Sequence, residues 1–252
     1  MLTLHALTTG YRHTIISQHL NATLPQGTLT ALLGTNGAGK STLLRTMARF
    51  QPPLAGSISW QGTDTAQLSA RQLARTMSVV LTFKPEAEAL TAAEVVEMGR
   101  IPYTTMLSGT SEADRQAVEQ AMQLTHTTPF ARRPISTLSD GERQRVFIAK
   151  ALAQNTPVIL LDEPTVFLDF PAKIATMRLL KKLAHDAQKT ILLSTHDVEL
   201  ALHMADNLWL LNQQTLTSGS PQLLAANGCI GRFFNTEGVQ FDAATMRFDM
   251  RD

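Results

Sequence analysis

The sequence predicts an α/β fold in which a parallel core sheet is accompanied by a small antiparallel β layer and an inserted helical subdomain. Two stretches favour the parallel sheet. An apolar run at residues 28–33 ends at a glycine-rich turn, and apolar side chains then recur at helical spacing over residues 41–50. A second unit of strand followed by helix starts after Pro157. Strands that alternate with helices are typical of a parallel sheet covered on both faces, with ligands beyond the carboxyl ends of its strands.

The other elements follow from shorter patterns. Residues 2–24 and 56–60 show the alternation of antiparallel strands with polar turns, which predicts the β layer. Three stretches in the middle of the chain look helical, with little strand signal between them: 91–99, 111–125 and 141–154. In the second unit, strands are expected at 158–161 and 190–194, with a helix around 174–183 between them.

We therefore expect a single domain over residues 1–252. Its core would comprise residues 1–83 and 156–252, and the helical subdomain would comprise residues 84–155. The C-terminal segment, residues 227–252, is expected to be a short strand-rich tail. Its phenylalanines are expected to pack rather than to take part in chemistry: Phe233, Phe234, Phe241 and Phe248.

Composition excludes several classes of protein. Lys and Arg number 22 against 21 Asp and Glu, so no overall field would draw the chain onto nucleic acid, and none is expected as a partner. The single cysteine, Cys229, cannot form an internal disulfide, and the first residues lack the pattern of a secretory signal. The longest apolar runs fall far short of the roughly 20 residues of a membrane-spanning helix. We expect a cytoplasmic chain.

The glycine-rich turn fits the phosphate-loop pattern of Gly, four residues, Gly, Lys, and Ser or Thr, between a strand and a helix. Backbone N–H groups would surround a phosphate, Lys40 would neutralise the β and γ oxygens, and Ser41 would ligate Mg²⁺. The alternative is a glycine-rich turn without a ligand. The residues expected to contact ATP here are Gly34, Thr35, Asn36, Gly37, Ala38, Gly39, Lys40, Ser41 and Thr42.

Two carboxylates end the apolar run at residues 158–161. Charges at the end of a buried strand need a reason. Asp162 is placed to hold Mg²⁺, directly or through water, and Glu163 to polarise an attacking water molecule. The alternative is a pair of charges at the N-terminus of a helix.

With these motifs present, residues 138–146 (LSDGERQRV) resemble the signature motif of the ABC transporter ATPase family. The resemblance implies a P-loop NTPase fold and a homodimer of ATPase subunits packed head to tail. Ser139 and Gly141 would then cap the γ-phosphate bound by the other subunit. The alternative is an ordinary helix start with Ser139 or Asp140 as N-cap.

Further matches to the family cover nearly the whole chain. Tyr11 resembles the aromatic residue that stacks on adenine, and Asp169 the D-loop aspartate, which would lie across the dimer. His196 resembles the switch histidine, which would hydrogen-bond the γ-phosphate and hold Glu163 and water in place. A lone Tyr or His is more often a packing residue.

One position departs from the family pattern. Phe83 falls about where most members carry a glutamine that touches Mg²⁺ and the attacking water, and a phenyl ring can do neither. Thr82 could substitute, or the alignment could shift by one residue. The hypothesis that follows is slow or uncoupled hydrolysis, which leaves open a regulatory ABC module with weak hydrolysis.

Residues 94–103 resemble a segment of cassettes that drive import of iron-siderophore complexes, haem or vitamin B12. The following apolar loop, with Ile101, Tyr103, Met106 and Leu107, is interpreted as a dock for transmembrane permease subunits, or else as a cover of the helical lobe. The resemblance implies a peripheral protein on the inner face of the cell membrane and a substrate-binding protein that delivers the cargo. A soluble ABC ATPase not involved in transport is the remaining alternative.

Overall fold

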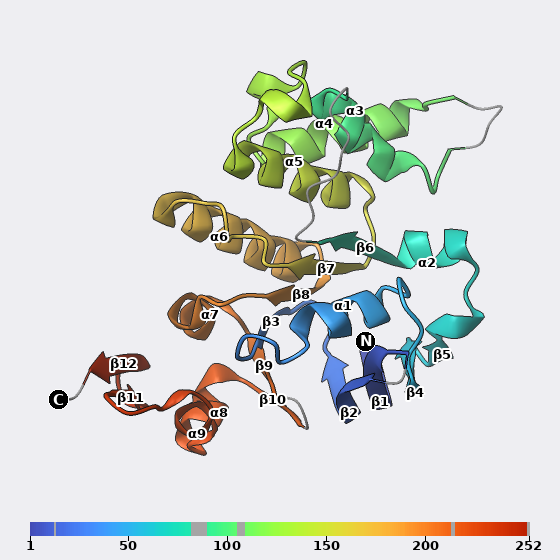
Figure 1. Ribbon diagram of the computed structural model, residues 1–252. Helices are drawn as coiled ribbons and strands as arrows, with labels where there is room; N and C mark the ends of the chain where they lie inside the picture. The colour runs from blue at the N-terminus through green and yellow to red at the C-terminus, as the bar shows by residue number, and fades with distance from the viewer. Residues whose placement is uncertain (13, 82–89, 105–108, 213–214, 251–252) are drawn as a thin grey trace.

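The computed structural model describes residues 1–12, 14–81, 90–104, 109–212 and 215–250. Its centre is a six-stranded sheet with the order β10-β9-β3-β8-β7-β6 (Figure 1). Strand β10 is antiparallel to β9, and the other neighbours are parallel. The strands are β3 (Leu29–Leu33), β6 (Met77–Val80), β7 (Val158–Asp162), β8 (Thr190–Ser194), β9 (Asn207–Leu211) and β10 (Leu216–Gly219).

Both faces of this sheet are covered, which is why β3, β7 and β8 are buried along their whole length. One face packs against helices that include α6 (Phe170–Asp186), α7 (Val198–Met204), α8 (Pro221–Ala226) and α9 (Cys229–Phe234). The other packs against α1 (Lys40–Met47) and the second sheet. The parallel core sheet expected from the sequence is confirmed.

The second sheet is the small antiparallel layer that the sequence predicts. Its order is β2-β1-β4-β5. The strands are β1 (Leu2–Tyr11), β2 (Thr14–Leu24), β4 (Ala55–Trp60) and β5 (Thr63–Asp64). A short helix, α2 (Ala70–Thr76), leads from this layer into β6 at the edge of the core sheet (Figure 1).

Helices α3 (Ala92–Glu97), α4 (Glu112–Leu124) and α5 (Asp140–Ala153) form a separate group at the top of Figure 1. They share an apolar cluster of their own. Arg100 ties the group together, because its guanidinium donates to Asp114 Oδ1 (2.8 Å) and to Ala153 O (2.7 Å) and lies over the ring of Tyr103.

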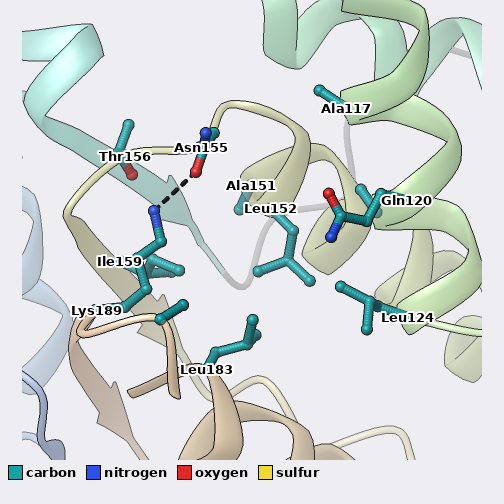
Figure 2. A pocket seen from close by; sticks show the side chains of 12 residues that line it. Ala117, Gln120, Leu124, Ala151, Leu152, Asn155, Thr156, Ile159, Leu183 and Lys189 are labelled. Atoms are coloured by element: carbon teal, nitrogen blue, oxygen red, sulfur yellow. Dashed lines mark hydrogen bonds between the residues drawn. The ribbon is translucent and has the colours of Figure 1, made fainter. Parts of the chain in front are cut away.

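The helical group does not pack completely against the core. A cavity of about 140 Å³ lies between α4 and α5 on one side and β7 and α6 on the other (Figure 2). At its edge Lys189 Nζ donates to Asn155 Oδ1 (2.8 Å), and burial lowers the pKa of this lysine. The cavity supports the proposal that residues 84–155 form a subdomain distinct from the core.

The C-terminal segment is only partly the expected strand-rich tail. A hairpin of β11 (Val239–Asp242) and β12 (Arg247–Met250) is present, but residues 229–234 form α9, so the expectation was wrong there. Gly228, at φ +67°, is the N-cap of this helix. The helical spacing of Ile230, Phe233 and Phe234 puts these three side chains on one face, where they pack against the core. Phe241 and Phe248 join them in an aromatic cluster, and all four phenylalanines pack as expected.

Candidate active site

The predicted phosphate loop connects β3 to α1 at the carboxyl edge of the core sheet. Gly37 and Gly39 adopt positive φ angles of 78° and 97°, which residues other than glycine rarely adopt. A Cβ at Gly34 would lie 2.6 Å from Leu211 O, so only glycine allows this approach of β9. Helix α1 begins without a side-chain cap and without an acidic residue in its first turn. Its free N–H groups make this end of the helix suited to an anion.

Lys40 lies inside the loop and is almost wholly buried. Its Nζ donates to Gly34 O (2.8 Å) and to Thr35 O (3.3 Å). Burial lowers the pKa of the Lys40 ammonium, while the nearby carboxylates of Glu163 and Asp162 raise it. The ammonium is therefore held by two loop carbonyls, which it can exchange for phosphate oxygens.

Asp162 and Glu163 are held by Ser194, which was not predicted from the sequence to be part of the site. Ser194, at the end of β8, donates from Oγ to Asp162 Oδ1 (2.6 Å) and accepts from the Glu163 N–H (3.0 Å). Both strand ends are buried, and Asp162 lies directly opposite Ser194 in the ladder. Glu163 has φ +49°, a left-handed conformation that strains a non-glycine residue.

His196 faces Glu163 across the site. His196 Nε2 lies 2.5 Å from Glu163 Oε1, and both side chains remain accessible to solvent. They line a pocket of about 250 Å³ together with Ile16 and the loop residues 36–42. The structure thus brings together the two residues that were predicted to be catalytic and the predicted phosphate loop. Ile16 was missed, because an exposed strand gives no sign that it adjoins the loop.

Tyr11 lies at the end of β1, with its ring half exposed. Thr42 Oγ1 lies 3.4 Å from the Tyr11 hydroxyl oxygen, in hydrogen-bond contact. This contact joins Tyr11 to the first turn of α1, where a base attached to a phosphate in the loop could reach it.

Ser139, Gly141 and Asp169 lie elsewhere, and none lines the pocket at the phosphate loop. Ser139 caps α5, since its Oγ accepts from Glu142 N–H (3.2 Å) and the Glu142 carboxylate accepts from Ser139 N–H (2.9 Å). Asp169 caps α6 by accepting from Ala172 N–H (2.9 Å). Within one chain, Ser139 is therefore the N-cap that the alternative interpretation expected.

Gly141 lies where α5 meets the segment that follows Glu163. A Cβ at this position would approach Phe167 O and Leu168 Cδ2 to 3.3 Å. The predicted signature and D-loop segments are consequently packed against each other. Four residues named above, Thr82, Phe83, Met106 and Leu107, lie outside the described residues.

Comparison with known proteins identifies the family. Residues 17–166 match the family model described as ABC transporter. The chain belongs to the ABC transporter family. The achromobactin transport ATP-binding protein of Dickeya dadantii is 38% identical over 94% of this chain and 88% of its own length. The petrobactin import ATP-binding protein of Bacillus anthracis is 39% identical over 92% of this chain and 85% of its own length.

Solved structures of ABC transporters have the same fold as this chain. A metal-chelate type ABC transporter in an inward-facing conformation superposes with a TM-score of 0.77 at 30% identity, covering 88% of this chain and 84% of its own. A dimeric ATP-binding cassette in a post-hydrolysis state, bound to ADP and Pi, has a TM-score of 0.78 at 28% identity, covering 88% and 99%. The family, the fold class and the ATPase activity expected from the sequence are confirmed.

Clustered metal ligands and membrane-spanning helices are both lacking in the part of the chain that the structure describes. Among the described residues, no group of three or more His, Cys, Asp and Glu is placed to hold a metal ion. Over the same part of the chain, no helix is both long enough and apolar enough to span a bilayer.

Proposed function

We propose that this cassette energises import of an iron-siderophore complex or a related chelate by binding and hydrolysing ATP in a homodimer. The observation that carries the chemistry is the single pocket that holds the phosphate loop, Glu163 and His196. The relatives named above are ATP-binding proteins of achromobactin transport and of petrobactin import, which supports the class of cargo. Haem and cobalamin remain within the proposed range.

In the proposed mechanism, loop N–H groups and Lys40 hold the triphosphate, and Tyr11 stacks on adenine. Glu163 orients and polarises the attacking water. His196 holds Glu163 by the contact described above and reaches the γ-phosphate. Mg²⁺ would neutralise charge on the phosphate oxygens. Ser41 and Asp162 fit this ion, because Mg²⁺ in phosphate sites takes one or two protein oxygens and completes its shell with phosphate and water.

The second subunit completes the site. We propose that Ser139 and Gly141 of one copy approach the γ-phosphate bound by the other, and that Asp169 contacts the other copy. Similarity to dimeric cassettes supports this arrangement. ATP would bind best to the closed pair, and hydrolysis would reopen it.

The permease subunits would dock beside the helical group. Met98 and Ile101 are exposed there, the latter at 61%. The adjoining turn is held from α2, since Arg71 Nε and Arg75 Nε donate to Pro102 O (2.9 and 3.0 Å). A permease that binds this turn would contact both the helical group and the core. We place the assembled cassette at the cytoplasmic face of the membrane, with a substrate-binding protein on the opposite side.

Phosphate release by the purified chain tests the chemistry. Glu163→Gln should lower kcat at least 100-fold and leave ATP binding intact, because the amide keeps the shape but loses the charge that polarises water. Glu119→Gln, on an exposed face of α4, is the control and should hydrolyse ATP at the rate of the unaltered chain. Unaltered hydrolysis by Glu163→Gln would refute the assignment.

Uptake of ⁵⁵Fe-labelled siderophores by cells that lack this chain tests the cargo. Uptake should fall and return when the chain is restored. Ile101→Asp should fail to restore it although the purified variant still hydrolyses ATP. Normal uptake of every ferric siderophore in the deleted strain would contradict the cargo proposal.

A cassette with weak hydrolysis remains the second candidate, and Phe83 is the observation that favours it. If Phe83 limits turnover, Phe83→Gln should raise kcat. Equal rates for the two chains would rule this out.

A further inference from the structure

Asp197 lies between His196 and α7, but it does not cap the helix. Its backbone has φ −85° and ψ 80°, and its side chain makes no cap hydrogen bond. The carboxylate instead lies 3.2 Å from Lys173 Nζ, and the Asp197 N–H donates to Thr195 Oγ1 (3.0 Å). The residue next to His196 is thus attached to a different helix, α6.

Lys173 belongs to the part of the chain that follows Glu163. It lies in the first turn of α6, where its N–H donates to Asp169 O (2.9 Å). The side chains of Lys173 and Asp197 are 27% and 32% exposed, so water screens their attraction only in part.

Two contacts therefore join the segments that follow β7 and β8. One is the contact of Glu163 with His196, and the other is the ion pair of Lys173 with Asp197. Because Asp162 and Ser194 also pair at the strand ends, the two segments are connected at three places. A single contact would let the loop that carries His196 rotate, whereas two contacts restrain both its position and its orientation.

We propose that Lys173 is a positioning residue for ATP hydrolysis, which holds His196 against Glu163 through Asp197. This inference rests on the proposed function of Glu163 and His196. Lys173 acts on the water-activating pair and not on the phosphate loop, so its loss should lower kcat and leave nucleotide affinity nearly unchanged.

Steady-state hydrolysis by the purified chain tests this role. Lys173→Met should lower kcat about fivefold with KM changed less than about twofold, as expected for a partly screened ion pair that acts on the reacting groups. Lys173→Arg keeps the charge and should restore most of kcat. Lys182→Met, at an exposed position of the same helix, should match the unaltered chain.

A double variant shows whether the two residues act as a pair. If they do, adding Lys173→Met to a chain that already carries Asp197→Asn should lower kcat little further. Three outcomes would each overturn the proposal. The losses of kcat could be additive in the double variant, Lys173→Arg could lose as much kcat as Lys173→Met, or the kcat of Lys173→Met could lie within twofold of that of the unaltered chain.

Histidine side-chain ¹⁵N NMR of the nucleotide-free chain separates this inference from the proposed function. The His196 signal should move in Lys173→Met and stay in place in Lys182→Met. If the unaltered chain does not hydrolyse ATP, the proposed function fails, and the NMR arm still decides whether Lys173 positions His196. An unmoved His196 signal in Lys173→Met would overturn the positioning role.

Discussion

Ser194 links the two acidic residues of the site, and its removal should destabilise the fold measurably. Ser194→Ala deletes a hydroxyl that donates to Asp162 Oδ1 at 2.6 Å and accepts from the Glu163 N–H at 3.0 Å. The residue is fully buried, so water cannot replace either bond. A hydrogen bond to a charged group contributes about 1.5–3 kcal/mol, and one between neutral groups about 0.5–1.5 kcal/mol.

The expected loss in the free energy of unfolding is therefore about 2–4 kcal/mol, or a fall of about 1 M in the urea midpoint. Urea unfolding of the nucleotide-free chain, followed by circular dichroism, measures it. The matched control is Thr190→Val on the same strand. Thr190 is also fully buried, and among the described residues its Oγ1 has no hydrogen-bond partner.

Thr190→Val exchanges an unpaired hydroxyl for a methyl group of the same shape, so it should leave stability unchanged or raise it. The contrast between two buried hydroxyls on one strand separates the loss of hydrogen bonds from the removal of a hydroxyl as such. A loss below about 1 kcal/mol for Ser194→Ala, or equal losses for both variants, would refute the reasoning.

The remaining predictions concern pH and the phosphate loop. Hydrogen bonds from Ser111 and Arg100 lower the pKa of Asp114 from 3.8 to about 2, so its stabilising effect is complete at neutral pH and is lost as the pH falls between these values. Asp114→Asn should accordingly lower the urea midpoint at pH 7 but match the unaltered chain near pH 2, and a difference independent of pH would contradict this. Gly34→Ala places a Cβ against the carbonyl at the end of β9, whereas Gly37→Ala meets no atom within 4 Å and carries only the strain of positive φ, about 1 kcal/mol. Gly34→Ala should therefore lose more stability in urea unfolding, and the reverse order would be evidence against the close approach.

The sequence predicts best where a motif and its local structure coincide. The phosphate-loop pattern needs a strand before it and a helix after it, and β3 and α1 supply both. Asp162 and Glu163 stand out because carboxylates at the end of an apolar run are rare. The alternation in residues 2–24 sufficed for the antiparallel layer, since one face of that layer is buried and the other is exposed.

Features that depend on neighbours distant in sequence could not be predicted. Ser194 becomes part of the site only because β7 and β8 are adjacent in the sheet, and no local pattern encodes that order. The same holds for the pairing of Lys173 with Asp197, which are 24 residues apart. Helix α9 was missed for a different reason, because its six residues are too few for a clear helical period.

The left-handed backbone of Glu163 sets a limit on how this protein can be engineered. A side chain at φ +49° costs about 1–2 kcal/mol that a glycine would not incur. A screen that rewards thermal stability alone should thus favour glycine at this position and discard the carboxylate. Variants of this cassette selected for robustness should be screened for turnover in the same round, since stability favours glycine at this position whereas the proposed mechanism needs the Glu163 carboxylate.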